Sequence, residues 1–312
     1  MSTPQKQLPT VKNAMSIDVE DYFHVAAFKS NIDPKTWDSM HCRIERNMDV
    51  VMSLLRRNNV KATFFTLGWL AQRYPNIVKN IVAEGHELAS HGYGHQMIGD
   101  MTPMSFKEDV SKAKRLLEDV AGVAVKGYRA PSFSIALKTL WAHDVLADTG
   151  HQYSSSVYPI KHDLYGMPSA PRFGYQLPNG LIEIPATSLR IVGRNFPASG
   201  GGFFRLFPSS LSHAIIRKIN RDDQQSAIFY CHPWEFDPDQ PRVLGASRKS
   251  KFRHYINLKQ NPKKFDQLLG AFEWAPIREV FSDLLSESER FTNIAPVISP
   301  ANNVSKCIAH RN

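Results

Sequence analysis

The feature that most constrains the fold is a regular alternation of short β-rich runs with amphipathic helical segments. Hydrophobic periodicity and turn residues predict strands at 14–19, 60–67, 86–90, 125–131, 180–186 and 226–231. The same criteria predict helices over 44–59, 68–84, 105–122, 137–150 and 208–220. Strands that alternate with helices form parallel βαβ units. We therefore expect an α/β fold with a parallel sheet.

Length and the missing nucleotide motif favour a barrel of βαβ units, complete or incomplete, over an open doubly wound sheet. A (β/α) barrel commonly needs a single domain of this size, and the chain has 312 residues. No G-x-G-x-x-G follows the first predicted strand, and the glycine cluster SGGGFF at 199–204 is misplaced for a dinucleotide. We expect one barrel domain over 14–285, with a C-terminal extension from about residue 235. Residues 1–13 are interpreted as a polar leader and 286–312 as a flexible tail.

Composition narrows the class of protein. The net charge of +9 suits a polyanion, an acidic glycan or an anionic membrane surface, but the cations are scattered apart from RKSKFRH at 248–254. No nucleic-acid-reading module is present, so we expect no nucleic-acid partner. Three cysteines without C-x-x-C exclude a disulfide framework and a thiolate zinc site. No signal-peptide core and no apolar run of about 18 residues occur, so we expect a cytoplasmic protein, with peripheral attachment to the inner membrane as the alternative.

The first polar cluster follows the first strand, in SIDVED at 16–21. Catalytic groups of a barrel lie where strands end and loops begin. Asp18 and Glu20 share a strand face by alternation, and Asp21 lies just past the strand end. Crowded carboxylates raise one another's pKa unless a cation neutralises them, so a divalent ion would stabilise this cluster. A solvated acidic turn is the alternative interpretation.

The second cluster is HELASHGYGH at 86–95, where two of the three histidines have a spacing suited to a metal. His91 and His95 are four residues apart, as for two imidazoles on one ion. Gly92 and Gly94 disfavour a helix, so we expect the pair in a loop at the strand end. His86 has no such partner and is interpreted as a structural residue at the strand entrance.

Two further polar groups follow later strands. Arg129 precedes Pro131, which stiffens the loop, and an arginine can orient a carboxylate by a two-pronged contact. His232 follows the apolar run AIFYC and precedes Pro233-Trp234, a position suited to a general acid. Acids, paired histidines, an arginine and a late histidine together indicate metal-assisted hydrolysis. Serine hydrolase chemistry has no support, because no G-x-S-x-G occurs.

The order of these motifs resembles the polysaccharide deacetylases, carbohydrate esterase family 4, with their nodulation-type deacetylase homology domain. The counterparts here are DVED (18–21), HGYGH (91–95), RAP (129–131) and FYCHPWE (229–235). SIDVEDYFHVAAF, GYRAPSFSI, SGGGFFRLFP and HPWEFDPDQPR look like the subgroup found with exopolysaccharide-export and exosortase systems. The likeness runs from about residue 14 to 285. It implies a distorted (β/α) barrel that binds Zn²⁺, or another divalent ion such as Co²⁺, through Asp-His-His.

Carried over residue by residue, the resemblance implies a role for each motif. His91 and His95 would be metal ligands, Asp18 the general base for the water, His232 the acid for the leaving amine, and Arg129 the group that steadies the base.

This sequence departs from the family pattern in two places. The usual Asp-Asp is replaced by D-V-E-D, so the carboxylate ligand is either Glu20 or Asp21. Alternation favours Glu20, whereas side-chain identity and position favour Asp21. Ser154 stands where relatives often carry a charged residue, which would alter how Arg129 is held.

We therefore expect a metal-dependent N-deacetylase acting on N-acetylhexosamine units of a bacterial exopolysaccharide or its precursor, and associated with the exopolysaccharide assembly. Pro131, Trp234 and Tyr158 are candidates for substrate binding, with a place in the core as the alternative for the aromatics. Two rival functions remain: a metal-independent amidohydrolase or deaminase acting on a small cyclic amide, and a non-catalytic glycan-binding component of an export system.

Overall fold

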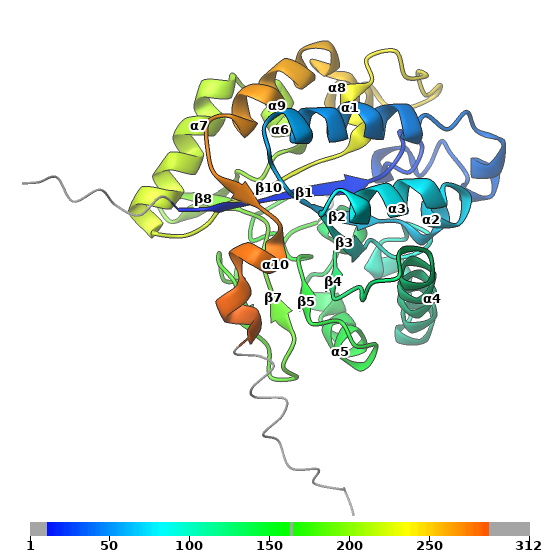
Figure 1. Ribbon diagram of the computed structural model, residues 1–312, viewed down its shortest axis with the longest axis horizontal. Coiled ribbons are helices and arrows are strands. Elements are labelled where there is room, and N and C mark those ends of the chain that lie inside the picture. The colour runs from blue at the N-terminus through cyan, green and yellow to red at the C-terminus, as the bar shows by residue number, and fades with distance from the viewer. Residues whose placement is uncertain (1–10, 163–164, 287–312) are drawn as a thin grey trace, which may run out of the picture.

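A curved parallel sheet forms the centre of the protein in the computed structural model, which describes residues 11–162 and 165–286 (Figure 1). The nine strands run in the order β10-β1-β2-β3-β4-β5-β7-β6, and β11 also pairs with β1. All neighbours are parallel except β6 and β7. The strands are β1 (Asn13–Val19), β2 (Thr63–Thr66), β3 (Glu87–Ser90), β4 (Gly127–Tyr128), β5 (Tyr153–Ser154), β6 (Tyr175–Gln176), β7 (Ile182–Glu183), β10 (Ile228–Cys231) and β11 (Trp274–Ala275).

Helices cover the outside of this sheet. Figure 1 shows α1, α7 and α9 on one side of β1 and β10, while α2 to α5 follow the curve of β2 to β5. Within the described residues no pairing joins β6 to β10, so the barrel is incomplete. The predicted barrel-type α/β fold is confirmed. The helices are α1 (Ile44–Arg57), α2 (Gly68–Arg73), α3 (Pro75–Ala83), α4 (Pro103–Ala121), α5 (Trp141–Asp148), α6 (Gly201–Leu206), α7 (Ser209–Lys218), α8 (Arg248–Tyr255), α9 (Asn261–Leu269) and α10 (Ile277–Val280).

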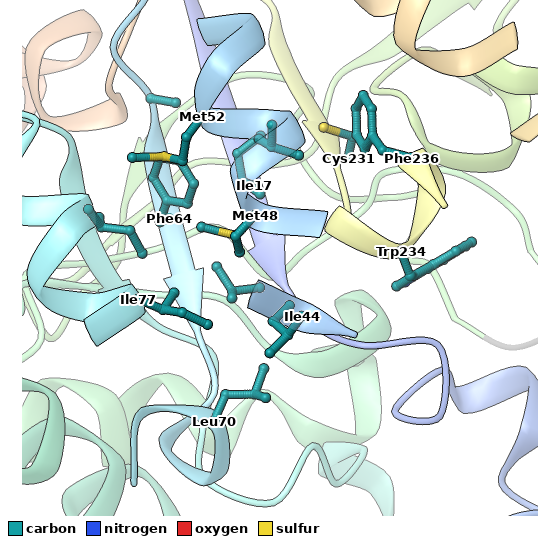
Figure 2. Packing of buried hydrophobic residues seen from close by; sticks show 14 of the residues in the cluster. Ile17, Ile44, Met48, Met52, Phe64, Leu70, Ile77, Cys231, Trp234 and Phe236 are labelled. Carbon is teal, nitrogen blue, oxygen red and sulfur yellow. The ribbon is translucent and has the colours of Figure 1, made fainter. Parts of the chain in front are cut away.

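Helix α1 shows how the sequence pattern produces the packing. Its apolar positions recur at helical spacing, so Met48 and Met52 lie on one face and are buried. Figure 2 shows both side chains between α1 and the strands that carry Ile17 and Phe64. Burying each such side chain stabilises the fold by about 1.5–3 kcal/mol. This packing holds β1, which carries the acidic cluster, against the rest of the core.

Two of the predicted strands are reduced to very short ones. The runs 125–131 and 180–186 form only β4 and β7, with two residues each. Side-chain oxygens replace the missing ladder bonds, because a Glu183 carboxylate oxygen accepts the N–H groups of Ser156 and Val157 at 2.9 Å each, and the Ser156 hydroxyl accepts the N–H of Ala130 at 2.9 Å. Strand periodicity does not reveal where side-chain oxygens take the place of backbone carbonyls.

Further parts of the chain were not anticipated. A separate antiparallel hairpin joins β8 (Ser188–Ile191) to β9 (Arg194–Pro197). The predicted leader 1–13 and tail 286–312 lie almost wholly outside the described residues. No helix that the structure describes is long and apolar enough to cross a membrane.

Candidate active site

The carboxyl ends of β1, β3, β4 and β10, which with β2 form one side of the sheet, bring the predicted site residues together. Asp18 and Glu20 come from β1 and the residue just after it, and His91 follows β3. Arg129 follows β4, and His232 follows β10. The strands are parallel, so their carboxyl ends share one edge of the sheet, where a barrel carries its chemistry.

Glu20, His91 and His95 converge on one point. Glu20 Oε1 lies 3.1 Å from His91 Nε2 and 3.0 Å from His95 Nε2, and all three side chains are buried. Their ligand atoms lie within 4.8 Å of one another. Ligands bound tetrahedrally to zinc at about 2.0–2.1 Å are separated by roughly 3.3 Å, and carboxylate oxygen and imidazole nitrogen are ligands that zinc accepts. The donor set therefore fits a divalent ion.

The tautomer of His91 strengthens this conclusion. His91 Nδ1 donates a hydrogen bond to the carbonyl oxygen of Arg129 at 2.7 Å. A neutral ring then presents the lone pair of Nε2 to Glu20 Oε1, and two acceptors at 3.1 Å need a proton or a metal ion to neutralise their repulsion. Metal-binding histidines commonly donate their other ring N–H to a carbonyl in this way.

Asp21 does not join this cluster. Its two carboxylate oxygens accept the backbone N–H groups of Tyr22, at 2.7 Å, and of Arg43. Burial raises the pKa of Asp21 despite these hydrogen bonds. Of the two carboxylates that the sequence leaves open as ligands, only Glu20 reaches the imidazoles, whereas Asp21 anchors the loop backbone.

The histidine pair lies in a tight loop, as the two glycines predicted. Gly92 adopts φ +74°, and a Cβ at this position would lie 2.7 Å from Asp109 Oδ2. The Asp109 carboxylate, from α4, accepts the N–H groups of Tyr93 at 2.8 Å and Gly94 at 3.1 Å. Asp109 therefore holds the loop between the two imidazoles. The role of Asp109 cannot be read from the sequence, because nothing distinguishes a single polar position on a helix.

His86 lies apart from this site at the start of β3. It is buried, and its Nδ1 accepts the N–H of Ala62 at 3.1 Å. Burial lowers the pKa of His86 to about 4, so the ring is neutral.

Asp18 and Arg129 form a fully buried ion pair. Arg129 Nη1 lies 2.7 Å from Asp18 Oδ1 and also donates to the Ser16 hydroxyl at 2.8 Å. The remaining guanidinium donors bond to the carbonyl and hydroxyl oxygens of Ser155 at 3.1 and 3.0 Å. The contact with Asp18 is therefore one-pronged rather than two-pronged, since the serines use the other donors. Ser154 bonds to the hydroxyl of Ser156 at 2.7 Å and does not hold Arg129.

His232 lies close to both Asp18 and Glu20. Its Nε2 lies 3.9 Å from both Asp18 Oδ2 and Glu20 Oε1, while its Nδ1 lies 2.6 Å from Glu235 Oε1. Burial by itself lowers the pKa of His232, but Glu20, Glu235 and Asp18 outweigh it and raise the pKa to about 9. The imidazole is thereby kept protonated near neutral pH, as a proton donor requires.

Glu20 is ionised in the same environment. Burial opposes its charge, yet His95, His232 and His91 together hold the pKa of Glu20 well below its usual range. The site thus places an ionised carboxylate and a protonated imidazole side by side.

A cleft of about 440 Å³ opens onto these groups. Trp234 lines it, with one ring face on His232. The other two residues predicted to bind substrate do not line it: Pro131 begins a buried 3₁₀ turn, and the Tyr158 hydroxyl accepts the N–H of Ala198 at 3.1 Å inside the core. Glu235, also in the lining, was missed, although its place three residues after His232 was a readable signal.

Sequence models of two families match the chain. The polysaccharide deacetylase family matches residues 35–154, and a domain of unknown function, DUF3473, matches residues 155–282. The single sheet runs across the boundary between them, because β5 pairs with both β4 and β7.

Two relatives resemble the chain in sequence, and one solved structure resembles it in fold. A peptidoglycan-N-acetylglucosamine deacetylase of Bacillus cereus is 38% identical over 93 residues, 30% of this chain and 34% of that protein. A chitooligosaccharide deacetylase of a Bradyrhizobium species is 28% identical over 108 residues, 35% of this chain and 47% of that protein. The chain thus spans about a third to a half of the length of these relatives. A crystal structure from Mycobacterium smegmatis, provisionally named a polysaccharide deacetylase, has the same fold, with a TM-score of 0.55, 18% identity, and coverage of 95% of this chain and 97% of that chain. Residues 35–154 of the chain thus match the polysaccharide deacetylase family, and both relatives are named as deacetylases.

Proposed function

We propose that the protein is a metal-dependent N-deacetylase acting on N-acetylhexosamine units of a bacterial glycan. The observation that carries the proposal is the convergence of Glu20, His91 and His95 beside the buried Asp18–Arg129 pair and His232. An oxygen ligand, two imidazoles, a carboxylate and a protonated imidazole are the groups that hydrolysis of an amide by activated water needs.

Each residue has a distinct part in the reaction. Glu20, His91 and His95 would hold the ion, which would supply Lewis-acid activation of the attacking water and stabilisation of the oxyanion. Asp18 accepts the proton of the water, and Arg129 orients its carboxylate by the 2.7 Å contact. His232 donates a proton to the leaving amine from the cleft side. Acetate and a free amino sugar are the products.

The glycan itself is inferred from relatives and from the motif resemblance. Names of the relatives identify peptidoglycan and chitooligosaccharide deacetylases. SGGGFFRLFP and HPWEFDPDQPR resemble proteins of exopolysaccharide systems, so we propose an exopolysaccharide or its precursor as the substrate. Association with the assembly that makes or exports it stays a prediction.

Metal analysis combined with acetate release tests the proposal. The purified protein should contain about one equivalent of a divalent ion and should release acetate from an N-acetylglucosamine oligomer in a chelator-sensitive way. Metal-free activity on a cyclic amide, or sugar binding without turnover, would support the rival functions instead.

Two histidine variants sharpen this test. His91→Ala should lose both the ion and the activity. His86→Gln is the matched control, because this nearby histidine bonds to Ala62 rather than to the site and should leave the metal content unchanged. Retained acetate release in His91→Ala refutes the mechanism.

A further inference from the structure

We propose that the segment matched by the domain of unknown function, residues 155–282, supplies the proton-donating part of this active site, with Glu235 and Arg205 as the positioning residues of His232. This inference rests on the proposed function, and it gives a role to a segment whose family description assigns none. The other groups come from outside that segment: Asp18 lies on β1 and Glu20 just after it, and His91, His95 and Arg129 lie in the deacetylase match.

Glu235 determines the orientation of the His232 ring. Glu235 is 1% exposed, and its Oε1 accepts hydrogen bonds from His232 Nδ1 at 2.6 Å and from the His232 backbone N–H at 3.1 Å. Both contacts involve one oxygen, so the ring is tied to its own backbone through the carboxylate. Nδ1 therefore keeps its proton in the hydrogen bond to Glu235, and Nε2 faces Asp18 and Glu20.

Arg205 holds the other oxygen of Glu235. Its Nε lies 2.8 Å from Glu235 Oε2, and its side chain is 2% exposed. The remaining guanidinium nitrogens donate to the backbone carbonyls of His254 at 2.6 Å, Ile256 at 3.0 Å and Arg253 at 3.0 Å. Each nitrogen therefore has an acceptor, and the charge of the buried Glu235 is neutralised by a guanidinium that is itself fixed to the backbone.

The glycine cluster explains how Arg205 reaches this place. Gly200 has φ +129°, and a Cβ there would lie 2.1 Å from the carbonyl oxygen of Tyr230 in β10. An isolated bridge joins Gly200 to Tyr230. Only glycine permits this approach, which sets helix α6 against the strand that His232 follows. SGGGFFRLFP thus serves the placement of an arginine rather than the binding of a phosphate.

Aromatic stacking restrains the same ring. The Trp234 ring stacks on His232 at 5.2 Å and 21°, and also on His254 at 4.1 Å and 14°. Trp234 and His254 are buried. Rotation of His232 away from the cleft would break both this stack and the hydrogen bond to Glu235.

The chemistry of proton donation follows from this arrangement. As the bond between the carbonyl carbon and the nitrogen breaks, the proton on Nε2 passes to the departing nitrogen, and the ring is left neutral with its remaining proton bound to Glu235. Asp18 has taken a proton from the water, so one proton is accepted and one is donated in each turnover. Without Glu235 the neutral ring has no preference for the tautomer that accompanies donation from Nε2.

A comparison of leaving groups tests the positioning role. An amine leaves only when protonated, whereas 4-nitrophenolate leaves from 4-nitrophenyl acetate without a proton. For the metal-loaded Glu235→Gln variant, kcat on an N-acetylglucosamine oligomer should fall by about 100-fold or more. KM should change by less than about threefold, and the ratio of amide to ester kcat should fall by roughly the same factor as the amide kcat. Arg205→Met should lower this ratio in the same direction, and Arg205→Lys should restore part of it.

A neighbouring ion pair provides the matched control. Asp237 is a buried carboxylate two residues after Glu235 and pairs with Arg43, without contact to His232. Asp237→Asn should change both activities by the same factor and leave the ratio as in the wild type. An equal loss of both activities in Glu235→Gln, or no loss, overturns the inference.

Proton NMR reads the same contact without any substrate. The proton between His232 Nδ1 and Glu235 should give a far-downfield signal that Glu235→Gln removes and Asp237→Asn retains. If the wild type releases no acetate but this signal behaves as expected, the proposed function fails while the positioning of His232 stands. If no signal depends on Glu235, the positioning itself is refuted.

Discussion

Neutralising Glu20 and neutralising its neighbour Asp21 should affect different properties of the protein. Glu20 Oε1 lies 3.1 and 3.0 Å from the imidazoles of His91 and His95. Asp21 instead accepts hydrogen bonds from the backbone N–H groups of Tyr22, in the same loop, and Arg43, at the start of α1. We expect Glu20→Gln to weaken metal binding and Asp21→Asn to weaken folding.

The size of each effect follows from these contacts. Loss of an outer partner of a metal ligand typically costs about 10–100-fold in affinity, so loss of a direct ligand in Glu20→Gln should cost at least about 100-fold, or about 2.8 kcal/mol. Asn at position 21 has one acceptor oxygen where Asp21 has two, so one buried N–H loses its partner. That change should lower the free energy of unfolding by about 1–3 kcal/mol, and the affinity for the ion should change less than about threefold.

Competition with a chromogenic chelator measures the affinity for zinc, and urea denaturation of the metal-free protein measures folding separately. If Asp21→Asn loses the ion while Glu20→Gln keeps it, the assignment of Glu20 as the ligand is wrong. Equal loss of affinity in both variants would mean that the cluster acts as one acidic patch, which the separate contacts of the two carboxylates contradict.

Three further predictions follow from the same contacts. Gly92→Ala should lower the free energy of unfolding by about 1–2 kcal/mol, because φ is +74° and the added methyl group would lie 2.7 Å from Asp109. In the control Gly94→Ala the added methyl group would lie at an ordinary 3.6 Å from the same carboxylate. Urea titration should therefore show a change in the free energy of unfolding of less than about 0.5 kcal/mol for this control. Asp18→Asn should lower kcat for acetate release by about 10²–10⁴-fold with the metal content retained, and loss of the ion would contradict its role as a base rather than a ligand. Burial opposes the charge of Glu183. Hydrogen bonds from His143 and from the backbone N–H groups of Ser156 and Val157 nevertheless lower the pKa of Glu183 below 4.5. The ionised Glu183 carboxylate therefore stabilises the fold above about pH 4.5, and this contribution is lost as the pH falls through the lowered pKa. Between about pH 6 and pH 3, the urea midpoint of the wild type should fall more than that of Glu183→Gln. An equal fall in both proteins would show that Glu183 has no lowered pKa.

Local pattern predicted a good part of the fold. The α1 stripe of Met48 and Met52 and the apolar run that became β1 repeat with the period of their element, so their burial could be inferred residue by residue. The shortened strands β4 and β7 could not, because the groups that replace their ladder bonds come from elsewhere in the chain: Glu183 bonds to N–H groups 26 and 27 positions earlier.

The candidate site divides in the same way. Residue types and their places after strands were enough to single out Asp18, His91 and His232, since parallel strands bring their carboxyl ends to one edge whatever the details of packing. The choice between Glu20 and Asp21 depended on which backbone N–H groups the acidic loop meets, and Arg43 comes from a different segment.

The sequence by itself determined which chemistry this protein can carry, because the metal-binding and proton-transferring side chains are properties of the residues and their order along the strands. Only the tertiary structure decided which of those side chains are held still. Asp109 holds the histidine loop from α4, and Arg205 with Glu235 holds His232 from α6 and the turn after β10. Except for the short-range contact of Glu235 with His232, these contacts join residues distant in the chain, 16 positions apart for Tyr93 and Asp109 and 30 for Arg205 and Glu235, and no short-range periodicity records a contact of that kind.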